Sequence, residues 1–508
     1  MRKNLLPSVV MVVAVLATAC TEKLRLEPGL GGFDVTITVS GSGGDGSAAS
    51  PFDIPGGEVT VHYSATAYDV HGQPLDFTGP VGVQAAPGQI VSVNPDPPRF
   101  SEGRAEGEVS VRKVFGRFTL WLQDVQLVPG DVVEGGSKPL QLLRREGSFA
   151  AGTSNAVFFR RPRLYEIQYA PWLEQEENID SSVLHDMFVD IDCRADDPAG
   201  PFQDGHGQLV VTGIFNEGFF VSDLAGDGAF NHLYVYNYSY PDDVEVGDRL
   251  DRLVGSSQDF SGCTQISFPS WQRAVDERLD PEPFRIDDLD GALPPALITT
   301  AMCNENSTSN LHLCGHSKKN WTMEARESSR VRLENVRAPD VFVDCDFNGD
   351  SEVVPDWLDA SHPEAVCMVN CLKHDGAVSF AVQTVVGTGA ALADVIEQDP
   401  VMCPWEADLQ GVGPRCRRVR IGGGHICAEL TTMRQFGQWV VALDDGTGPL
   451  INVITSQSLV NYDPLAAENL GRTIPFLQGN LLQVRAARPR WVVYVGRLAG
   501  DAPADMQR

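Results

Sequence analysis

The amino-acid sequence predicts an all-β protein made of several small domains. Stretches in which apolar and polar residues alternate recur along the chain, as in Phe33–Val39, where every second residue is apolar. Gly, Pro and Asp residues that favour turns separate these stretches, which is typical of antiparallel sheets. At 508 residues the chain is too long for a single hydrophobic core, so we expect about three domains.

The first twenty residues have the features of a secretory signal. Arg2 and Lys3 precede an apolar run over Leu5–Val15, which is too short for an ordinary membrane-spanning helix. The segment Leu16-Ala17-Thr18-Ala19-Cys20 resembles the lipobox of bacterial lipoproteins, in which the cysteine is acylated after cleavage. Alanine stands three residues before this cysteine, where leucine is usual.

The lipobox resemblance implies that residues 1–19 are a signal peptide and that residues 20–32 form a flexible tether behind a lipid on Cys20. The expected location is the cell envelope, at the outer membrane of a Gram-negative bacterium. An uncleaved anchor, or ordinary secretion with an incidental Cys20, are the alternatives, and both also take the chain out of the cytoplasm.

Residues 33–170 are expected to form the first domain, a two-layer β-sandwich. Alternation continues over Val59–Ala67 and Phe118–Leu122. The segment Ala67–Val83 resembles the middle of bacterial immunoglobulin-like modules, which implies an immunoglobulin-like spacer without cysteines. The Gly/Ser/Asp tract over residues 40–50 is flexible in composition.

Residues 180–275 are expected to form a small five-stranded barrel. Gly213 lies within an apolar strand, where glycine allows a sharp bend. The segments GFFVSD (Gly218–Asp223), LYVYNYS (Leu233–Ser239) and VEVGDRLDRLVG (Val244–Gly255) resemble OB-fold modules that accompany secreted bacterial nucleases. The resemblance implies an OB fold without nuclease activity, because this chain has no counterpart of the nuclease catalytic domain.

A second, degenerate OB-like module is expected over residues 326–499, after a cysteine-containing linker over 276–325. Its opening strand is Val331–Val336, and the pattern resumes from residue 436 onward, so an insertion of about 339–428 interrupts it. Residues 500–508 are expected to be a frayed tail.

The cysteines predict disulfides, since the chain is expected in an oxidising compartment. His312, Cys314 and His316 alternate and could form a zinc site with Cys303, but we expect a Cys303–Cys314 disulfide instead. Besides Cys20 there are ten cysteines, enough for up to five disulfides: Cys193, Cys263, Cys303, Cys314, Cys345, Cys367, Cys371, Cys403, Cys416 and Cys427.

Three tyrosines form the strongest binding signal in the sequence. Tyr234, Tyr236 and Tyr238 have the spacing that places side chains on one face of a strand, with Phe219 or Phe220 beside them. Such a platform can stack on bases, sugars or side chains of a partner, although aromatic residues also simply line half-buried sheets.

The charge of the protein distinguishes between these possible ligands. The whole chain has a formal net charge of −29, and residues 180–271 hold sixteen Asp and Glu against three Arg. Nucleic-acid surfaces need cations to neutralise phosphates, so we expect no nucleic acid at this module. The second module is richer in arginine, and Arg485, Arg488 and Arg490 are the candidates for binding a polyanion. A solvated face, or pairing with an acidic neighbour, is the other explanation of that cluster.

A possible calcium loop lies in the insertion. Its acidic and amide residues alternate as in the first half of an EF-hand loop, but Pro355 occupies the position of the final bidentate Glu. An ordinary Asp/Asn turn is therefore the alternative. The candidate ligands are Asp344, Asp346, Asn348, Asp350 and Glu352.

The chain contains no motif of hydrolase or nucleotide chemistry. Gly-x-Ser-x-Gly, His-Glu-x-x-His and Gly-x-x-x-x-Gly-Lys are all missing from the sequence. We therefore expect a binding or structural lipoprotein that is not an enzyme, requires no cofactor, and holds a protein or glycan at its barrel faces. The alternative is an accessory nucleic-acid-binding protein that uses the arginine-rich module.

Overall fold

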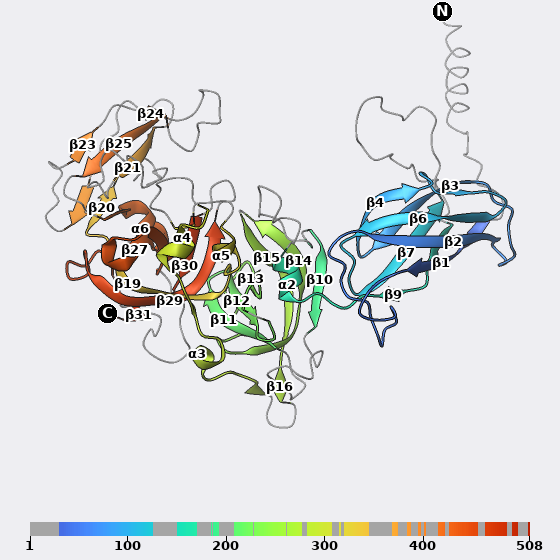
Figure 1. The fold of residues 1–508 in the computed structure, drawn as a ribbon, viewed down its shortest axis with the longest axis horizontal. Coiled ribbons are helices and arrows are strands. Elements are labelled where there is room, and N and C mark those ends of the chain that lie inside the picture. The colour runs from blue at the N-terminus through green and yellow to red at the C-terminus, as the bar shows by residue number, and fades with distance from the viewer. Residues whose placement is uncertain are drawn as a thin grey trace, which may run out of the picture. The chain divides into compact units, whose positions relative to one another are not determined.

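The chain is described by a computed structural model in which the residues fall into two compact units, Met1–Arg161 and Pro162–Arg508 (Figure 1). Both units are built from β-sheets with only short helices, so the predicted all-β class is confirmed. The described residues are 30–124, 150–169, 184, 186–192, 208–226, 228–260, 262–276, 282–306, 314–315, 320–344, 368–373, 384–387, 395–397, 401–402, 415–421, 426–455, 463–484, 490–495 and 506–507.

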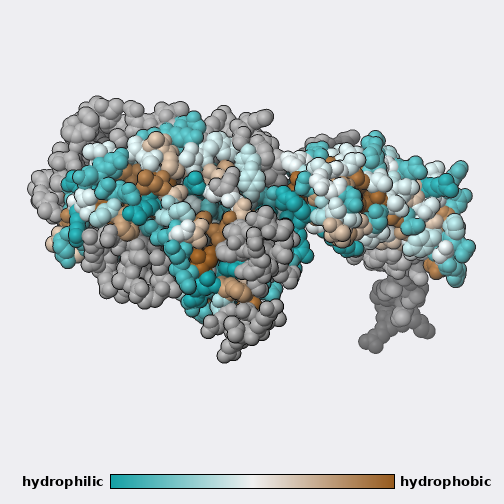
Figure 2. Space-filling view, turned by 60° about the horizontal axis from the view of Figure 1, so that its bottom comes forward, coloured by the Kyte–Doolittle hydropathy of each residue, from teal (hydrophilic) through white to brown (hydrophobic). Residues whose placement is uncertain are grey.

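The predicted signal peptide and Cys20 lie outside the described residues. Within the described residues, no helix is long and apolar enough to cross a membrane. The predicted tether over 20–32 ends too late, because strand β1 already begins at Leu30. On the face shown in Figure 2, polar and apolar residues are mixed on both units.

The first unit consists of two sheets that share one hydrophobic core. Alternate residues of β2, such as Val61, Tyr63 and Ala65, are buried in it, as the alternating sequence predicts. One sheet has the order β1 (Leu30–Val39), β2 (Val59–Asp69), β6 (Arg104–Arg112), β4 (Gln89–Asn94). The other has the order β5 (Arg99–Phe100), β3 (Gly79–Ala86), β7 (Arg117–Asp124), β8 (Ala151–Thr153), with β9 (Val157–Phe158) also paired to β7.

The Gly/Ser/Asp tract of this unit is a compact loop. Its backbone closes through hydrogen bonds from Asp45 and Gly46 to Ser50, each 3.0 Å long. A side chain at Gly41 or Gly46 would collide with the ring of Phe52, so these glycines are needed for close packing. The glycines of this tract therefore reflect close packing of its backbone against the ring of Phe52.

The second unit begins with α2 (Leu164–Gln168) and a closed five-stranded barrel, with β10 (Phe188–Asp192) added beside β14. Neighbouring strands are antiparallel except β13 and β15, which are parallel. Gly213 lies at a register shift in β11, as its predicted role in bending requires. Around this first barrel the strands follow the order β11 (Leu209–Phe215), β12 (Gly218–Asp223), β13 (His232–Tyr236), β15 (Cys263–Arg273), β14 (Arg249–Phe260).

A second closed barrel repeats this arrangement. Its third and fifth strands, β28 and β30, are again the parallel pair, and β29 closes the barrel on β19. Around the barrel the strands follow the order β19 (Arg330–Arg337), β27 (Gln438–Ala442), β28 (Leu450–Ile454), β30 (Arg490–Tyr494), β29 (Thr473–Val484).

The predicted insertion separates the first two strands of this second barrel. Its strands form two further small sheets, and α6 (Leu430–Phe436) leads from them back to β27. These strands are β20 (Val341–Asp344), β21 (Met368–Lys373), β22 (Thr384–Gly387), β23 (Val395–Glu397), β24 (Val401–Met402), β25 (Arg415–Ile421) and β26 (Cys427–Glu429).

Two predicted connecting segments have structural roles. The expected linker over 276–325 contributes β18 (Ala296–Leu297), which pairs in parallel with β19 and extends the second barrel. The same segment carries β16 (Val275–Asp276), β17 (Glu282–Pro283), α3 (Leu289–Ala292), α4 (Thr300–Cys303) and α5 (Trp321–Glu324). The expected frayed tail carries β31 (Met506–Gln507), which pairs with β29. Both segments can pair there because β19 meets β27 only at Arg337 and β29 meets β30 only over Asn480–Val484, which leaves backbone groups free along the rest of each long strand.

The predicted Cys303–Cys314 disulfide is present, with a Cα–Cα distance of 4.2 Å, and the zinc alternative is wrong for these two residues. Cys263 is a free, buried thiol, so the ten cysteines cannot form five disulfides. All other cysteines lie outside the described residues or in strands described by their backbone alone.

Replacing Cys303 and Cys314 together with serine removes this cross-link. Because the bond joins residues 11 apart in sequence, we expect the free energy of unfolding of the second unit to fall by about 3 kcal/mol. Urea unfolding of the full chain, followed by tryptophan fluorescence, measures this change. An unchanged midpoint in the double variant would contradict the role of the bond.

Candidate functional site

The structure brings the predicted tyrosines together into a row of aromatic rings on the outer face of β12 and β13. Phe220 pairs with Tyr234 across these strands, and their ring centroids are 4.9 Å apart. The row continues from Tyr234 to Tyr236 over 6.3 Å and from Tyr236 to Tyr238 over 4.4 Å. It ends at Phe268 of β15, 5.2 Å from Tyr238. We call these five residues the aromatic row.

The inner end of the aromatic row is buried by the second barrel. Phe220 is 1% exposed and Tyr234 is 7% exposed, because Leu482 of β29 packs on them and Tyr494 of β30 lies beside them. Phe219 points the other way, into the first barrel, where its ring meets Trp271. The side chains of Phe219, Phe220 and Tyr234 are therefore buried within the protein rather than open to a ligand.

The outer end of the aromatic row faces solvent. Tyr238 is 51% exposed and Phe268 is 69% exposed, while Tyr236 is half-buried between them and the interior. Tyr236 and Tyr238 thus retain the predicted accessibility. The sequence did not predict Phe268, although an aromatic residue directly before Pro269 in a strand is a signal of irregular pairing.

Both exposed rings are carried by residues with a strained backbone. Tyr238 has φ of 61° and Phe268 has φ of 51°, a left-handed conformation that costs a bulky residue about 1 to 2 kcal/mol. Phe268 lies in a register shift, because Val254 pairs with Ser270 but Ser256 pairs with Ser267. Such bulges redirect a side chain, so the strain here presents an aromatic ring to solvent.

The phenol groups of Tyr234 and Tyr236 stay neutral. Burial raises the pKa of Tyr236, and the nearby Glu217 carboxylate raises it further. Burial also raises the pKa of Tyr234 strongly. At neutral pH these hydroxyls can therefore donate as well as accept hydrogen bonds.

A polar cluster lies next to the buried end of the aromatic row. The backbone N–H of Thr264 donates to Glu327 Oε2 over 3.1 Å, and both residues are buried. Burial raises the pKa of Glu327 and that of the Cys263 thiol well above their usual values. A neutral, buried thiol is a poor nucleophile, so this cluster is not suited to covalent catalysis.

Ser222 and His232 form a pair that superficially resembles a hydrolase dyad. Ser222 Oγ lies 2.7 Å from His232 Nδ1, and His232 Nε2 lies 3.2 Å from the carbonyl oxygen of Gly228. With its proton on Nε2, the ring accepts from the serine and donates to that carbonyl. Both side chains are buried, so we assign the pair to the packing of the barrel.

The other predicted sites fall largely outside the described residues. Arg485 and Arg488 are outside, and Arg490 is described by its backbone alone at the start of β30. Asp344 ends β20 and is likewise described by its backbone, while Asp346, Asn348, Asp350 and Glu352 are outside. Within the described part of the chain, no three His, Cys, Asp or Glu side chains are close enough to hold a metal ion.

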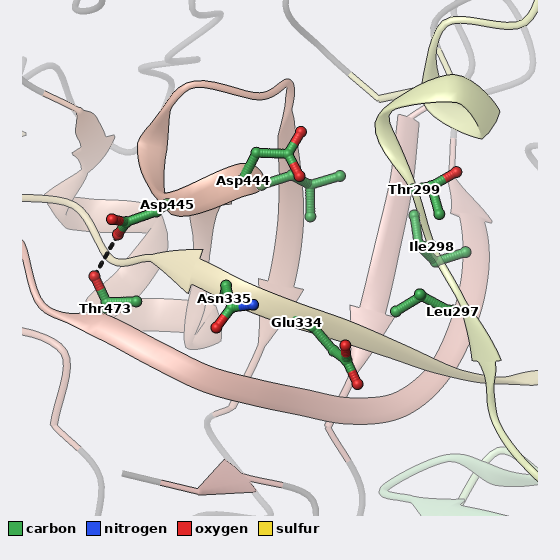
Figure 3. Close-up of a pocket in the computed structure, with 9 residues that line it drawn as sticks. Leu297, Ile298, Thr299, Glu334, Asn335, Asp444, Asp445 and Thr473 are labelled. Carbon is green, nitrogen blue, oxygen red and sulfur yellow. Dashed lines mark hydrogen bonds between the residues drawn. The ribbon is translucent and has the colours of Figure 1, made fainter.

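A cavity of about 490 Å³ is the second candidate site, and the sequence did not predict it (Figure 3). It lies at one end of the second barrel, between β18, β19, the start of β29 and the short helix η4 (Asp444–Gly446). Its lining residues are Leu297, Ile298, Thr299, Glu334, Asn335, Leu443, Asp444, Asp445 and Thr473.

No protein-family model, curated protein or solved structure matches this chain. The aromatic row and the cavity are therefore interpreted from their own geometry.

The buried His232 predicts a dependence of stability on pH. Burial lowers its pKa from 6.5 to about 4, so the unfolded chain binds the proton more readily than the folded chain. The contribution of neutral His232 to the free energy of unfolding is therefore fully present above about pH 6.5. It is lost as the pH falls towards 4, by up to about 3 kcal/mol.

Urea unfolding at pH 7 and at pH 4.5 measures this effect. The His232→Gln variant keeps a side chain that can donate and accept but cannot titrate. We expect it to show a smaller loss of stability between the two pH values than the unmodified chain. Equal losses in both proteins would show that His232 does not cause the dependence.

Proposed function

We propose that this chain is an exported, lipid-anchored binding protein that holds a glycan or protein ligand noncovalently at the exposed end of the aromatic row. Acylated Cys20 attaches it to the cell envelope, at the outer membrane of a Gram-negative bacterium. The proposal includes no catalytic step and no required cofactor.

The proposed architecture is an immunoglobulin-like sandwich followed by two OB folds. The two packed antiparallel sheets of the first unit support the sandwich assignment. The strand order 1-2-3-5-4-1, repeated in both barrels, supports the OB-fold assignment. OB folds bind their ligands mainly on the face of strands 2 and 3, which are β12 and β13 in the first barrel.

The single observation that carries the proposed binding function is the solvent exposure of Tyr238 and Phe268 on strained backbone. An irregularity of this kind persists only when the surrounding structure supports it, and it concentrates at ligand sites. Exposed aromatic rings stack on the C–H faces of sugars or on the apolar side chains of a partner protein. The acidic surroundings, with sixteen Asp and Glu over 180–271, disfavour nucleic acid.

The alternative function, nucleic-acid binding by the arginine-rich second module, gains no support from the described residues. Its candidates Arg485, Arg488 and Arg490 have no described side chains. The surface of the second module that is described includes three exposed carboxylates around the cavity, which is unfavourable for a polyanion.

Ligand binding is tested with the full chain on a glycan array and in affinity capture from envelope extracts, followed by titration of each ligand found. We expect Tyr238→Gly and Phe268→Gly each to weaken binding roughly tenfold, the loss of about 1.4 kcal/mol of stacking. Glycine adopts positive φ without strain, which offsets part of the stability that each variant loses with its ring contacts.

Phe260→Ala is the matched control, because Phe260 is also 69% exposed but belongs to no described ring contact of the aromatic row. Its affinity should stay unchanged. If the unmodified chain binds none of the glycans or proteins tested, the proposed function is wrong. It is also wrong if Phe260→Ala weakens binding as much as Phe268→Gly does.

Lipid attachment is tested by growing expressing cells with labelled palmitate. The chain should incorporate the label, and Cys20→Ser should abolish incorporation because the acylated thiol is lost. Cys263→Ser removes a buried thiol and should leave the label in place. A label that persists in Cys20→Ser would contradict the anchor.

A further inference from the structure

The cavity of the second barrel has two chemically distinct walls. Leu297 and Ile298, from β18 and the residue after it, form an apolar wall together with Leu443. Asp444 and Asp445 of η4 stand across from Leu297 and Ile298, and Glu334 lies on β19 between them (Figure 3). The cavity therefore combines an apolar surface with three carboxylates and shares no residue with the aromatic row.

Two hydroxyl groups orient the aspartates. Thr300 Oγ1 donates to Asp444 Oδ2 over 2.5 Å, and Thr473 Oγ1 donates to Asp445 Oδ1. Each hydroxyl engages one carboxylate oxygen. Among the described residues, no hydrogen bond or ion pair engages Asp444 Oδ1 or Asp445 Oδ2, which leaves an acceptor oxygen on each side chain.

Among the described residues, none of the side chains that line the cavity is cationic, although the Arg337 side chain packs against Gly446 of η4 nearby. Arg332 pairs with Glu334 at 2.9 Å, but its guanidinium lies over the ring of Phe476, 4.1 Å from the centroid. The aspartates have no described ion pair at all. The charge of the lining is therefore wholly negative, which is complementary to a cation.

The size and spacing of the acidic groups favour an organic cation over a metal ion. No three acidic, His or Cys side chains in the described ranges approach closely enough to coordinate one ion. A volume of about 490 Å³ exceeds what a bare ion fills and holds an extended side chain. Long basic side chains place their methylene groups along apolar surface while the charged end meets polar groups.

We propose that this cavity binds an arginine or lysine side chain presented by a basic segment of a partner protein. The methylene groups lie along Leu297, Ile298 and Leu443, and the charged end meets Asp444 and Asp445. This binding site is additional to the aromatic row and does not depend on the ligand of that row.

The test uses a fluorescein-labelled peptide with three arginines separated by alanines, titrated into the full chain and followed by anisotropy. The same peptide with citrulline in place of arginine has a similar shape without charge. We expect the arginine peptide to bind at least tenfold more tightly than the citrulline peptide. A lysine version of the peptide shows which of the two cations fits better.

The double variant Asp444→Asn/Asp445→Asn removes both charges at nearly constant shape, and asparagine tolerates the positive φ of these positions. This double variant should bind the arginine peptide at least tenfold more weakly than the unmodified chain does. The control Asp34→Asn/Glu106→Gln removes two exposed charges from β1 and β6 and should change the affinity less than twofold.

Three results would overturn the proposal. One is equal affinity for the arginine and citrulline peptides. Another is an equal loss of affinity in the double variant and in the control, which would show attraction to the net charge alone. The third is stoichiometric Ca²⁺ binding that displaces the peptide and disappears in the double variant, which would make the cavity a metal site.

Discussion

The packing of the second barrel on the outer face of β12 and β13 determines what the larger unit can present to a ligand. Phe220 and Tyr234 of the first barrel share an apolar cluster with Leu482, with Tyr494 packed against it. At the edge of this contact, Asn480 Nδ2 donates to Thr212 Oγ1 over 3.1 Å. A side chain at Gly213 would collide with the Asn480 amide, so the close approach of the two barrels requires glycine there.

This packing divides the aromatic row into a structural part and an accessible part. Burial of the inner rings anchors the strand, and the anchored strand supports the strained conformation of the exposed rings. A strained residue on a mobile loop would relax, whereas Phe268 is held by paired residues on both sides of its bulge. The rigid inner rings therefore preorganise the outer ones, which lowers the entropic cost of binding.

The all-β class, the position of the barrels and the Cys303–Cys314 bond could be predicted because each depends on local patterning or spacing. The alternation of Leu233, Tyr234, Val235 and Tyr236 indicates which residues share a face of β13. It does not indicate which face the rest of the chain covers. The burial of Tyr234 depends on Leu482, almost 250 residues away, and no local pattern encodes that contact.

The cavity could not be predicted for the same reason. Leu297, Glu334, Asp445 and Thr473 come from four separate segments that the topology of the second barrel brings together. In the sequence, Asp444 and Asp445 look like an ordinary acidic turn before a glycine. The sequence does not single out Phe268, because alternation assigns a residue to one face of a strand and a bulge reverses that assignment locally.

Because Cys263 is unpaired, an odd number of cysteines remains for further disulfides. Besides Cys20 the chain has ten cysteines, of which Cys263 is free and Cys303 and Cys314 are bonded to each other. The seven that remain are an odd number, so they cannot all be joined in pairs among themselves. If Cys20 carries a lipid, at least one of the seven is left either as a reduced thiol or as a covalent link to another molecule.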